Sequence, residues 1–216
     1  CIIYLGDDGK LHTSSRGATN YDSAMFEILT HPALIKLFKN NKGLMLDGEC
    51  YHHGYTLQQI NSIARTQKVA KDLEVLQFYW YDIVELNNPF KSRLAKMKSI
   101  AEELKEYGSE IGWDPDRIFK ENELRIQFVP QVEVSGWDNM MKLHNEYVSE
   151  GWEGLVIRDP NKPYKPAGRT NNMIKIKHYI DETFKIVGYE LGLRGSEDMS
   201  FICEMQDGKT FKAPPI

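Results

Sequence analysis

Apolar and polar residues alternate along several short segments of the chain, which is the pattern of strands with one buried face. Residues 1–5 and 10–14 show this pattern on either side of a Gly-Asp-Asp-Gly turn, which predicts a β-hairpin. The run at 75–84 is rich in aromatic and β-branched residues and predicts a central strand. Further strands are predicted at residues 44–51, 124–132, 153–159 and 172–178, with short strands from Thr183 onward.

Between these strands, apolar residues recur every three or four positions, which predicts helices. One helix covers about residues 33–40. A second begins at Thr56, which has the spacing of a capping box with Gln59. A third opens at Asn88 and Pro89, in the order of an N-cap and a first-turn proline. Its inward positions are predicted to be Phe90, Leu94, Met97, Ala101 and Leu104.

The last helix has signals at both ends. Ser135 and Asp138 have the spacing of a second capping box, and Gly151 ends the periodic stretch. Residues 108–122 are less regular and receive no assignment. Strands mixed with inserted helices in this way predict an α+β core with antiparallel sheets.

Composition places the chain among ordinary globular proteins, since 41% of its 216 residues are hydrophobic and 27% are charged. With 27 Lys and Arg against 31 Asp and Glu, the net charge is −4, so any nucleic-acid contact must use local basic patches. The three cysteines are scattered without a CxxC pair and predict neither a disulfide framework nor a zinc site. No apolar run is long enough for a membrane span and no secretory leader is visible, so we expect an intracellular protein without a membrane partner.

Both ends of the sequence predict a fragment. Cys1 stands within a predicted buried strand, and residues 200–211 form a strand, an Asp207-Gly208 turn and the start of another strand.

Lys175 and Lys177 are the most informative candidates for chemistry. They alternate with Ile174 and Ile176 in a predicted strand, so both lysines project from one face. At about 7 Å and an effective dielectric near 20, two ammonium groups repel by roughly 2 to 3 kcal/mol. A bound phosphate would remove this repulsion.

Two acidic islands precede the lysines, Asp47-Gly48-Glu49 and Glu153-Gly154. Strand parity places Asp47 and Glu49 on one face, and a carboxylate carried inward needs a partner such as a ribose hydroxyl, a lysine or a metal ion. Each island also has a structural interpretation: a common Asp-Gly turn, an acid at a strand end, or lysines on a solvated edge strand. The ordered combination of all three favours a nucleotide site.

Other features are compatible with function but are explained more simply by structure. His52 and His53 point to opposite faces of a strand and are treated as structural or surface residues. The aromatic run at 78–81 is predicted to be core, although one ring could cover a base. The loop 160–169 could hold a nucleic-acid backbone or be a plain connection. A solvated helix face is predicted for the basic strip Lys91, Arg93, Lys96 and Lys98.

In their order, these islands resemble the covalent nucleotidyltransferase superfamily, and most closely its ATP-dependent DNA ligases. The resemblance extends over nearly the whole chain. It rests on Ser15-Arg16-Gly17, Leu46-Asp47-Gly48-Glu49, Tyr79-Trp80-Tyr81-Asp82, the stretch from Glu153 to Arg158, and Ile174-Lys175-Ile176-Lys177. It implies an antiparallel-sheet, ATP-grasp-like adenylation domain at residues 1–180, truncated at its N-terminal end, and the beginning of an incomplete OB-fold at residues 181–216. The nucleophilic Lys-x-Asp-Gly motif of the family is missing and would lie just ahead of Cys1.

The resemblance implies that the intact protein seals nicks with a 3′-hydroxyl and a 5′-phosphate through a lysyl-AMP intermediate. Lys175 and Lys177 would grip the α-phosphate, and Glu153 would help to place a metal or orient the nucleophile. Glu49 would bind the ribose hydroxyls, Tyr81 would stack on adenine and, as the remaining nucleotide ligand, Arg16 would reach the sugar or phosphates. Arg158 is left out of the site, because it falls on the opposite strand face from Glu153.

The implied cofactors are ATP and Mg²⁺, and the implied partner is nicked duplex DNA. We expect a monomer with a role in DNA replication, repair and recombination, in the cytoplasm of a bacterium or a virus-infected cell, or in a nucleus. An RNA ligase or a capping-type nucleotidyltransferase would share these islands. A non-catalytic nucleotide or nucleic-acid binding module that has lost its nucleophile is an alternative of another class.

Overall fold

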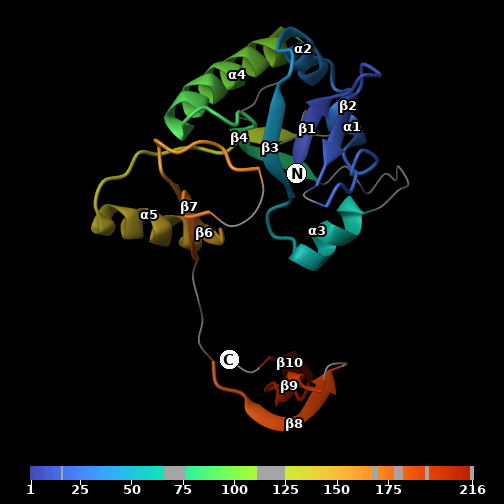
Figure 1. The fold of residues 1–216 in the computed structure, drawn as a ribbon, viewed down its shortest axis with the longest axis vertical. Coiled ribbons are helices and arrows are strands. Elements are labelled where there is room, and N and C mark those ends of the chain that lie inside the picture. Colours follow the sequence, from blue (N-terminus) through green and yellow to red (C-terminus); the bar gives the residue numbers. More distant parts are fainter. Residues whose placement is uncertain are drawn as a thin grey trace. The chain divides into compact units, whose positions relative to one another are not determined.

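The computed structural model describes residues 1–15, 17–65, 76–110, 125–166, 170–177, 182–192 and 195–214, without the side chains of 109–110 and 195–198. The chain divides into two compact units, Cys1–Ile176 and Lys177–Ile216 (Figure 1). The functional division into an adenylation domain and the start of an OB-fold stays a prediction.

The first unit is built on a mixed five-stranded sheet in the order β2-β1-β3-β4-β5. The predicted hairpin is confirmed, and β3 lies in the middle of the sheet. The run predicted as a central strand is β4, which lies between β3 and β5. The strands are β1 Ile2–Leu5, β2 Leu11–Ser14, β3 Met45–Tyr51, β4 Gln77–Ile83 and β5 Ile126–Phe128.

The sheet departs from the prediction at its far edge. β5 has three residues rather than the predicted nine and pairs with β4 in parallel. A parallel pair needs a long crossover, and here the intervening chain contains the helix α4, Phe90–Glu110. Alternation of apolar residues reports which face of a strand is buried but not the direction of its neighbour, so the parallel pairing could not be predicted.

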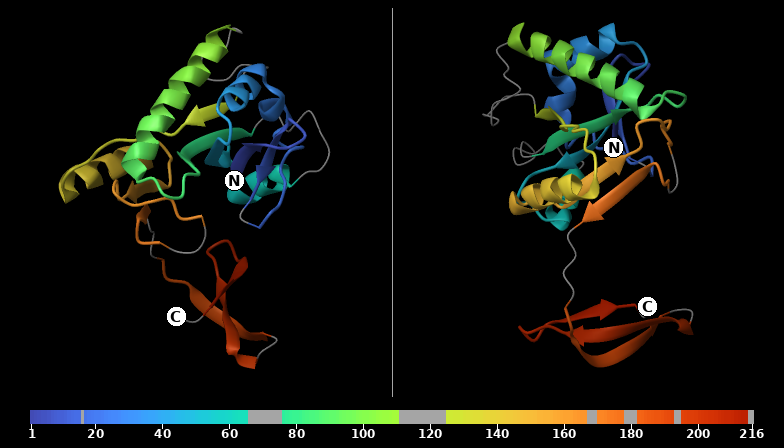
Figure 2. Two further views of the ribbon diagram at one scale, coloured as in Figure 1. Left: turned by 45° about the horizontal axis from the view of Figure 1, so that its top comes forward. Right: turned by 90° about the vertical axis from the view of Figure 1, so that its left-hand side faces the viewer.

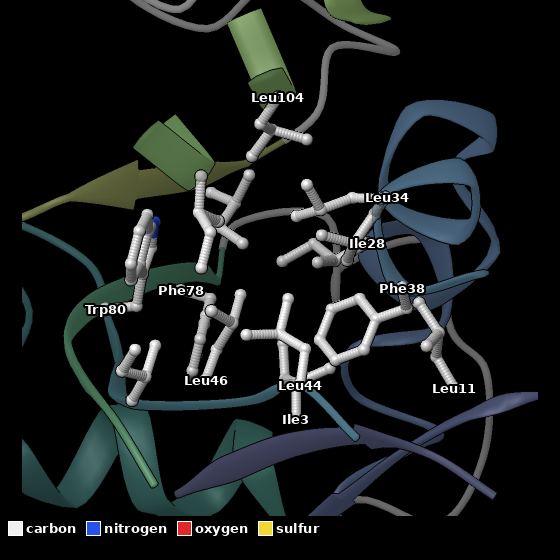
Figure 3. Packing of buried hydrophobic residues seen from close by; sticks show 14 of the residues in the cluster. Ile3, Leu11, Ile28, Leu34, Phe38, Leu44, Leu46, Phe78, Trp80 and Leu104 are labelled. Atoms are coloured by element: carbon white, nitrogen blue, oxygen red, sulfur yellow. The ribbon is translucent and has the colours of Figure 1, made fainter. Parts of the chain in front are cut away.

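Helices cover one face of the sheet and enclose the hydrophobic core. The helices α1 (Phe26–Thr30) and α2 (Pro32–Asn40) pack with α4 over the strands. Their apolar side chains meet those of β1, β3 and β4 in one cluster (Figure 3). The fully buried members include Ile3, Leu34, Leu37, Phe38, Leu46, Phe78, Trp80 and Met97. α1 was not predicted, because five residues are too short to show a helical period.

The two predicted capping boxes have different outcomes. The first is confirmed, since α3 (Leu57–Ala64) begins with Thr56 and Gln59 bonded reciprocally to each other's backbone. The second is wrong: α5 (Trp137–Ser149) begins one residue later than expected, with Gly136 at the N-cap at φ 82° and no side-chain cap. The predicted end of α5 is confirmed by Gly151, which has φ +90° and donates to Val148 O at 3.0 Å.

The start of α4 also differs from the prediction. The helix begins at Phe90, and the Asn88 side chain donates to Glu85 at 2.6 Å instead of capping the helix. Carbonyl groups from the distant loop after β6 accept the first helical N–H groups: Phe90 N donates to Lys162 O at 2.9 Å, and Lys91 N donates to Pro160 O at 2.8 Å. Tertiary contacts therefore take the place of a local cap.

Two further strands are β6 Gly154–Arg158 and β7 Met173–Lys177, and all but the last residue of β7 belong to the first unit. They form a two-stranded sheet, and α5 lies against β6 (Figure 2). Asp159 N donates to Asn172 O at 3.0 Å, so β7 starts beside the end of β6 and runs back along it.

The second unit is a three-stranded antiparallel sheet in the order β10-β9-β8. Its strands are β8 Lys185–Gly192, β9 Gly195–Glu204 and β10 Thr210–Ala213, and the predicted turn at Asp207 and Gly208 joins the last two. Whether this sheet opens an OB-fold stays a prediction. In the part of the chain that the structure describes, no helix has the length and apolar character needed to cross a membrane.

Candidate active site

The Asp-Gly-Glu island lies on β3, where burial alternates from residue to residue. Leu46 and Gly48 are buried, Asp47 is half-buried and Glu49 is exposed, as strand parity predicts. Gly48 is required by packing, because a Cβ atom there would stand 2.4 Å from the Tyr79 carbonyl oxygen. The register between β3 and β4 shifts between Asp47 and Gly48 at this close approach.

Asp47 has a partner within the chain. The Tyr164 hydroxyl donates to Asp47 Oδ2 at 2.8 Å, although the sequence had suggested a ribose, a lysine or a metal ion. Burial raises the pKa of the Asp47 carboxyl, and the hydrogen bond from Tyr164 opposes this shift. Asp47 therefore fastens the loop after β6 to β3, which leaves Glu49 as the exposed acid of this island.

A buried ion cluster of Asp82, Arg93 and Arg158 lies next to this contact. Arg93 binds both carboxylate oxygens of Asp82 through Nε at 2.8 Å and Nη2 at 2.9 Å, and Arg158 Nη1 donates to the same carboxylate. The prediction that Arg93 belongs to a solvated strip is wrong, since its side chain is 3% exposed. The cluster joins β4, α4 and β6. One of its members is Arg158, which the strand-parity argument had left out of the site.

Tyr81, the candidate adenine platform, is half-buried on β4. The guanidinium of Arg158 lies 5.3 Å from its ring centroid, a cation–π distance. Of the predicted aromatic core, Phe78 and Trp80 are buried in the core, whereas Tyr79 and Tyr81 lie on the opposite, half-exposed face of the strand. The sequence therefore placed only half of this aromatic run correctly.

An aromatic cluster that the sequence did not predict brings Glu49 and Glu153 to one place. Trp152, directly before Glu153, stacks on Tyr51 with centroids 5.6 Å apart and planes at 27°. Tyr79 meets both rings edge-on at 5.5 and 6.1 Å. The fourth member is His53, whose ring centroid lies 4.9 Å from that of Trp152 and whose Nδ1 is 3.2 Å from the Tyr51 hydroxyl.

The pKa of Tyr51 also indicates that Glu49 and Glu153 lie near one another. Burial raises the pKa of its hydroxyl, and the negative charges of Glu153 and Glu49 raise it further. Two carboxylates separated by about a hundred positions in the sequence thus act on one phenol. The local signals were present, since Tyr51 follows Glu49 by two residues and Trp152 adjoins Glu153, but their pairing across elements cannot be deduced from local patterns.

The other predicted residues lie as follows. Lys175 is exposed and Lys177 half-buried on the predicted strand, β7, but burial does not alternate along it, since Ile174 is exposed and Ile176 half-buried. β7 runs back along β6, the strand that begins directly after Glu153. Arg16 lies outside the described residues.

The acids fit a magnesium ion that is held together with a phosphate. Glu49 and Glu153 are exposed carboxylates, and Mg²⁺ is commonly bound by one or two carboxylates plus phosphate oxygens. Among the described residues there is no group of three or more His, Cys, Asp or Glu able to hold a metal by themselves. The donor set therefore suits a metal that arrives with a nucleotide.

A family model described as an ATP dependent DNA ligase domain matches residues 2–177. The chain belongs to the ATP-dependent DNA ligase family. The resemblance found in the sequence is thereby confirmed, and the matched range includes all five islands that carried it.

Relatives in sequence agree with this membership. The DNA ligase of African swine fever virus is 28% identical over an alignment of 181 residues that covers 79% of this chain and 38% of that protein. The DNA ligase of Haemophilus influenzae is 21% identical over 147 residues, which make up 68% of this chain and 48% of that protein. The chain thus spans less than half the length of these relatives.

Solved structures confirm the predicted fold class. The structure described as "DNA binding with a minimal scaffold: Structure-function analysis of Lig E DNA ligases" matches with a TM-score of 0.66 at 21% identity, over 98% of this chain and 72% of that one. The Chlorella virus DNA ligase-adenylate matches with a TM-score of 0.55 at 19% identity, over 98% of this chain and 73% of that one. The α+β nucleotidyltransferase fold of the ligases is therefore present here.

Proposed function

We propose that the intact protein is an ATP-dependent DNA ligase that seals nicks between a 3′-hydroxyl and a 5′-phosphate. The observation that carries this proposal is the family match over residues 2–177, which contains the acidic islands and the lysine pair in ligase order. The convergence of Glu49 and Glu153 beside Tyr51 supports it independently of the match.

Each candidate residue has one role in the proposed site. Lys175 and Lys177 hold the α-phosphate of ATP, and Glu49 accepts hydrogen bonds from the ribose hydroxyls. Tyr81 stacks on adenine. Exposure supports two of these assignments, since Glu49 and Lys175 are both open to a ligand. Arg16 would complete the contacts to the sugar or phosphates, and Glu153 would help to hold Mg²⁺.

The β1 strand leads the chain toward the site from its N-terminal side. Ile2 is the pairing partner of Asp47, and Gly48 N donates to Cys1 O at 2.9 Å, so the next position upstream would stand opposite Glu49. The lysine motif that the resemblance places ahead of Cys1 would therefore enter the structure beside Glu49. This geometry suits a nucleophile that must reach the same nucleotide.

The proposed chemistry is phosphoryl-type transfer in three steps. A lysine attacks the α-phosphate and releases pyrophosphate, AMP moves to the 5′-phosphate of a nick, and the 3′-hydroxyl then displaces AMP to form the phosphodiester bond. Each step builds negative charge at a phosphorus centre, and prearranged cations such as Lys175 and Lys177 stabilise it. Mg²⁺, when bound, would neutralise charge on the departing pyrophosphate.

Partners and setting follow from the proposed activity. We infer that nicked duplex DNA is the substrate, that the enzyme works as an intracellular monomer in DNA replication, repair or recombination, and that residues 181–216 open an OB-fold.

Labelling with radioactive ATP tests the function. The intact protein should acquire AMP on a lysine and seal nicked duplex DNA, while Lys175→Ala and Lys177→Ala abolish labelling because the α-phosphate loses its cations. Circular dichroism should show both variants folded, and Lys142→Ala, which changes an exposed lysine on α5, should keep full labelling.

The same assay separates the alternatives. Full labelling in both lysine variants would contradict the phosphate role. Sealing of nicked RNA, or transfer of GMP to an RNA end, would assign the protein to the RNA ligases or capping enzymes. Nucleotide binding without any labelling would leave a non-catalytic binding module.

A further inference from the structure

The aromatic cluster of Tyr51, His53, Tyr79 and Trp152 links the two segments that carry the candidate acids. Glu49 belongs to β3, whereas Glu153 lies between the end of α5 and the start of β6. Something must hold these two elements at a fixed separation, because a ribose and a metal-bound phosphate of one nucleotide have to be met at the same time.

On the Glu153 side, the backbone is held through its neighbours. Gly151 ends α5 at φ +90°, and a Cβ atom on it would stand 3.3 Å from the His53 ring, so a glycine lets that ring pack against the backbone. Trp152 then contacts three rings, those of Tyr51, His53 and Tyr79. Gly151 thus packs against the ring of His53, just beyond β3, and Trp152 packs against rings of β3 and β4.

On the Glu49 side, the link is the strand itself. Tyr51 follows Glu49 by two residues in β3, so the two side chains share a face at a spacing of about 7 Å. The Tyr51 ring lies nearly flat on Trp152, at 27°, and at right angles to Tyr79, at 89°. Flat rings have few rotatable bonds, and ring pairs in these geometries attract each other. The stack is therefore suited to fixing a distance.

We propose that Trp152 and Tyr51 are positioning residues, whose ring stack sets the separation between Glu49 and Glu153 so that both acids engage one metal-bound nucleotide. This inference rests on the proposed function. Neither ring is assigned contact with substrate. The two rings affect nucleotide binding only by positioning the two carboxylates, in the way that residues next to metal ligands commonly orient those ligands.

ATP affinity with and without Mg²⁺ tests this proposal at equilibrium. The chain carries no Lys-x-Asp-Gly motif, so ATP titrated into it in a calorimeter is bound but not consumed. The measured quantity is the ratio of the dissociation constants for metal-free ATP and MgATP. Trp152→Ala should lower this ratio about tenfold, because mutation of a residue supporting a metal ligand typically costs 10- to 100-fold in metal affinity. Trp152→Phe keeps a flat ring and should stay within about twofold of the wild type.

A double-variant cycle tests whether Trp152 acts on metal binding through the Glu153 carboxylate. In a Glu153→Gln background, which already lacks the carboxylate, Trp152→Ala should change the ratio no further. Trp152→Leu keeps apolar volume without a flat ring and should behave like Trp152→Ala. It also provides the measurement if the alanine variant does not fold.

Phe128→Ala is the matched control for a loss of stability alone. Phe128 is a half-buried ring on the far edge strand, tilted against Trp80 with centroids 4.6 Å apart, and its removal should leave the ratio unchanged. If Trp152→Ala also leaves the ratio unchanged while the wild type binds MgATP, the positioning role is wrong and the proposed function stands. If the wild type binds no ATP at all, both proposals are overturned.

Discussion

Removal of the Asp82 carboxylate should be among the most damaging single changes in the first unit. Its side chain is 4% exposed, that of Arg93 3% and that of Arg158 11%. Asp82 accepts two hydrogen bonds from Arg93, one from Arg158 and one from the Ile83 backbone N–H at 2.8 Å. Asp82→Ala would leave two guanidinium groups in a poorly solvated place without their counter-ion.

The expected loss follows from the cost of an unpaired buried charge. Breaking a buried ion pair by removing one partner costs about 3 to 5 kcal/mol, a large part of the roughly 5 to 15 kcal/mol that stabilises a typical domain. Arg93→Met should cost less than Asp82→Ala, since Asp82 keeps Arg158 as a partner. The double variant Asp82→Ala/Arg93→Met should fall short of the sum of the single losses by about 2 kcal/mol, because it strands fewer charges.

Urea denaturation followed by circular dichroism measures these losses as changes in the free energy of unfolding. Glu85→Ala is the control: it breaks the surface pair between Glu85 and Lys96, whose lysine is 50% exposed, and should cost less than about 1 kcal/mol. A loss below about 1 kcal/mol for Asp82→Ala, or strict additivity in the double variant, would refute the view that this cluster ties β4, α4 and β6 together.

Two further predictions concern the pH response of the hairpin and the packing of β3. Hydrogen bonds to Asp22 at 2.7 Å and Asp8 at 3.0 Å raise the pKa of His12. The stabilisation that protonated His12 adds to the folded state is therefore fully present below its ordinary pKa of about 6.5, and it is lost as pH rises through the raised pKa. The difference in unfolding free energy between wild type and His12→Gln should therefore shrink from about pH 6 to pH 9, and a difference that grows with pH would contradict it. Gly48→Ala should lower the free energy of unfolding, measured in urea, by about 3 kcal/mol, because its Cβ would stand 2.4 Å from a carbonyl oxygen of β4. The control Gly208→Ala, whose Cβ would meet open space, should cost about 1 kcal/mol. Equal losses would show that β3 and β4 can separate freely.

Local signals in the sequence predicted local structure well. The N-terminal hairpin, the capping box at Thr56 and the end of α5 at Gly151 each depend on residues a few positions apart, and the structure confirms all three. The order of the islands also sufficed to identify the ligase family. In each case, the decisive information lay within one short segment or in the order of such segments.

Interactions between distant segments were what the sequence could not supply. Arg93 looked like part of a solvated strip, because nothing near it in the chain reveals the buried carboxylate of Asp82. The same reason explains why Tyr164 was missed as the partner of Asp47 and Trp152 as the partner of Tyr51. The start of α4 at Phe90 likewise lacks a side-chain cap, and only the structure shows that carbonyl groups of a distant loop accept its first N–H groups.

That helix start has a consequence for the order in which the protein can assemble. During synthesis the first turn of α4 emerges from the ribosome well before residues 160–162, whose carbonyl groups accept its N–H groups. Until then those groups can bond only to water, so the amino end of the helix frays and becomes fixed when the later loop docks. The same docking brings Tyr164 to Asp47, so the loop is fastened to β3 only late in the folding of this unit.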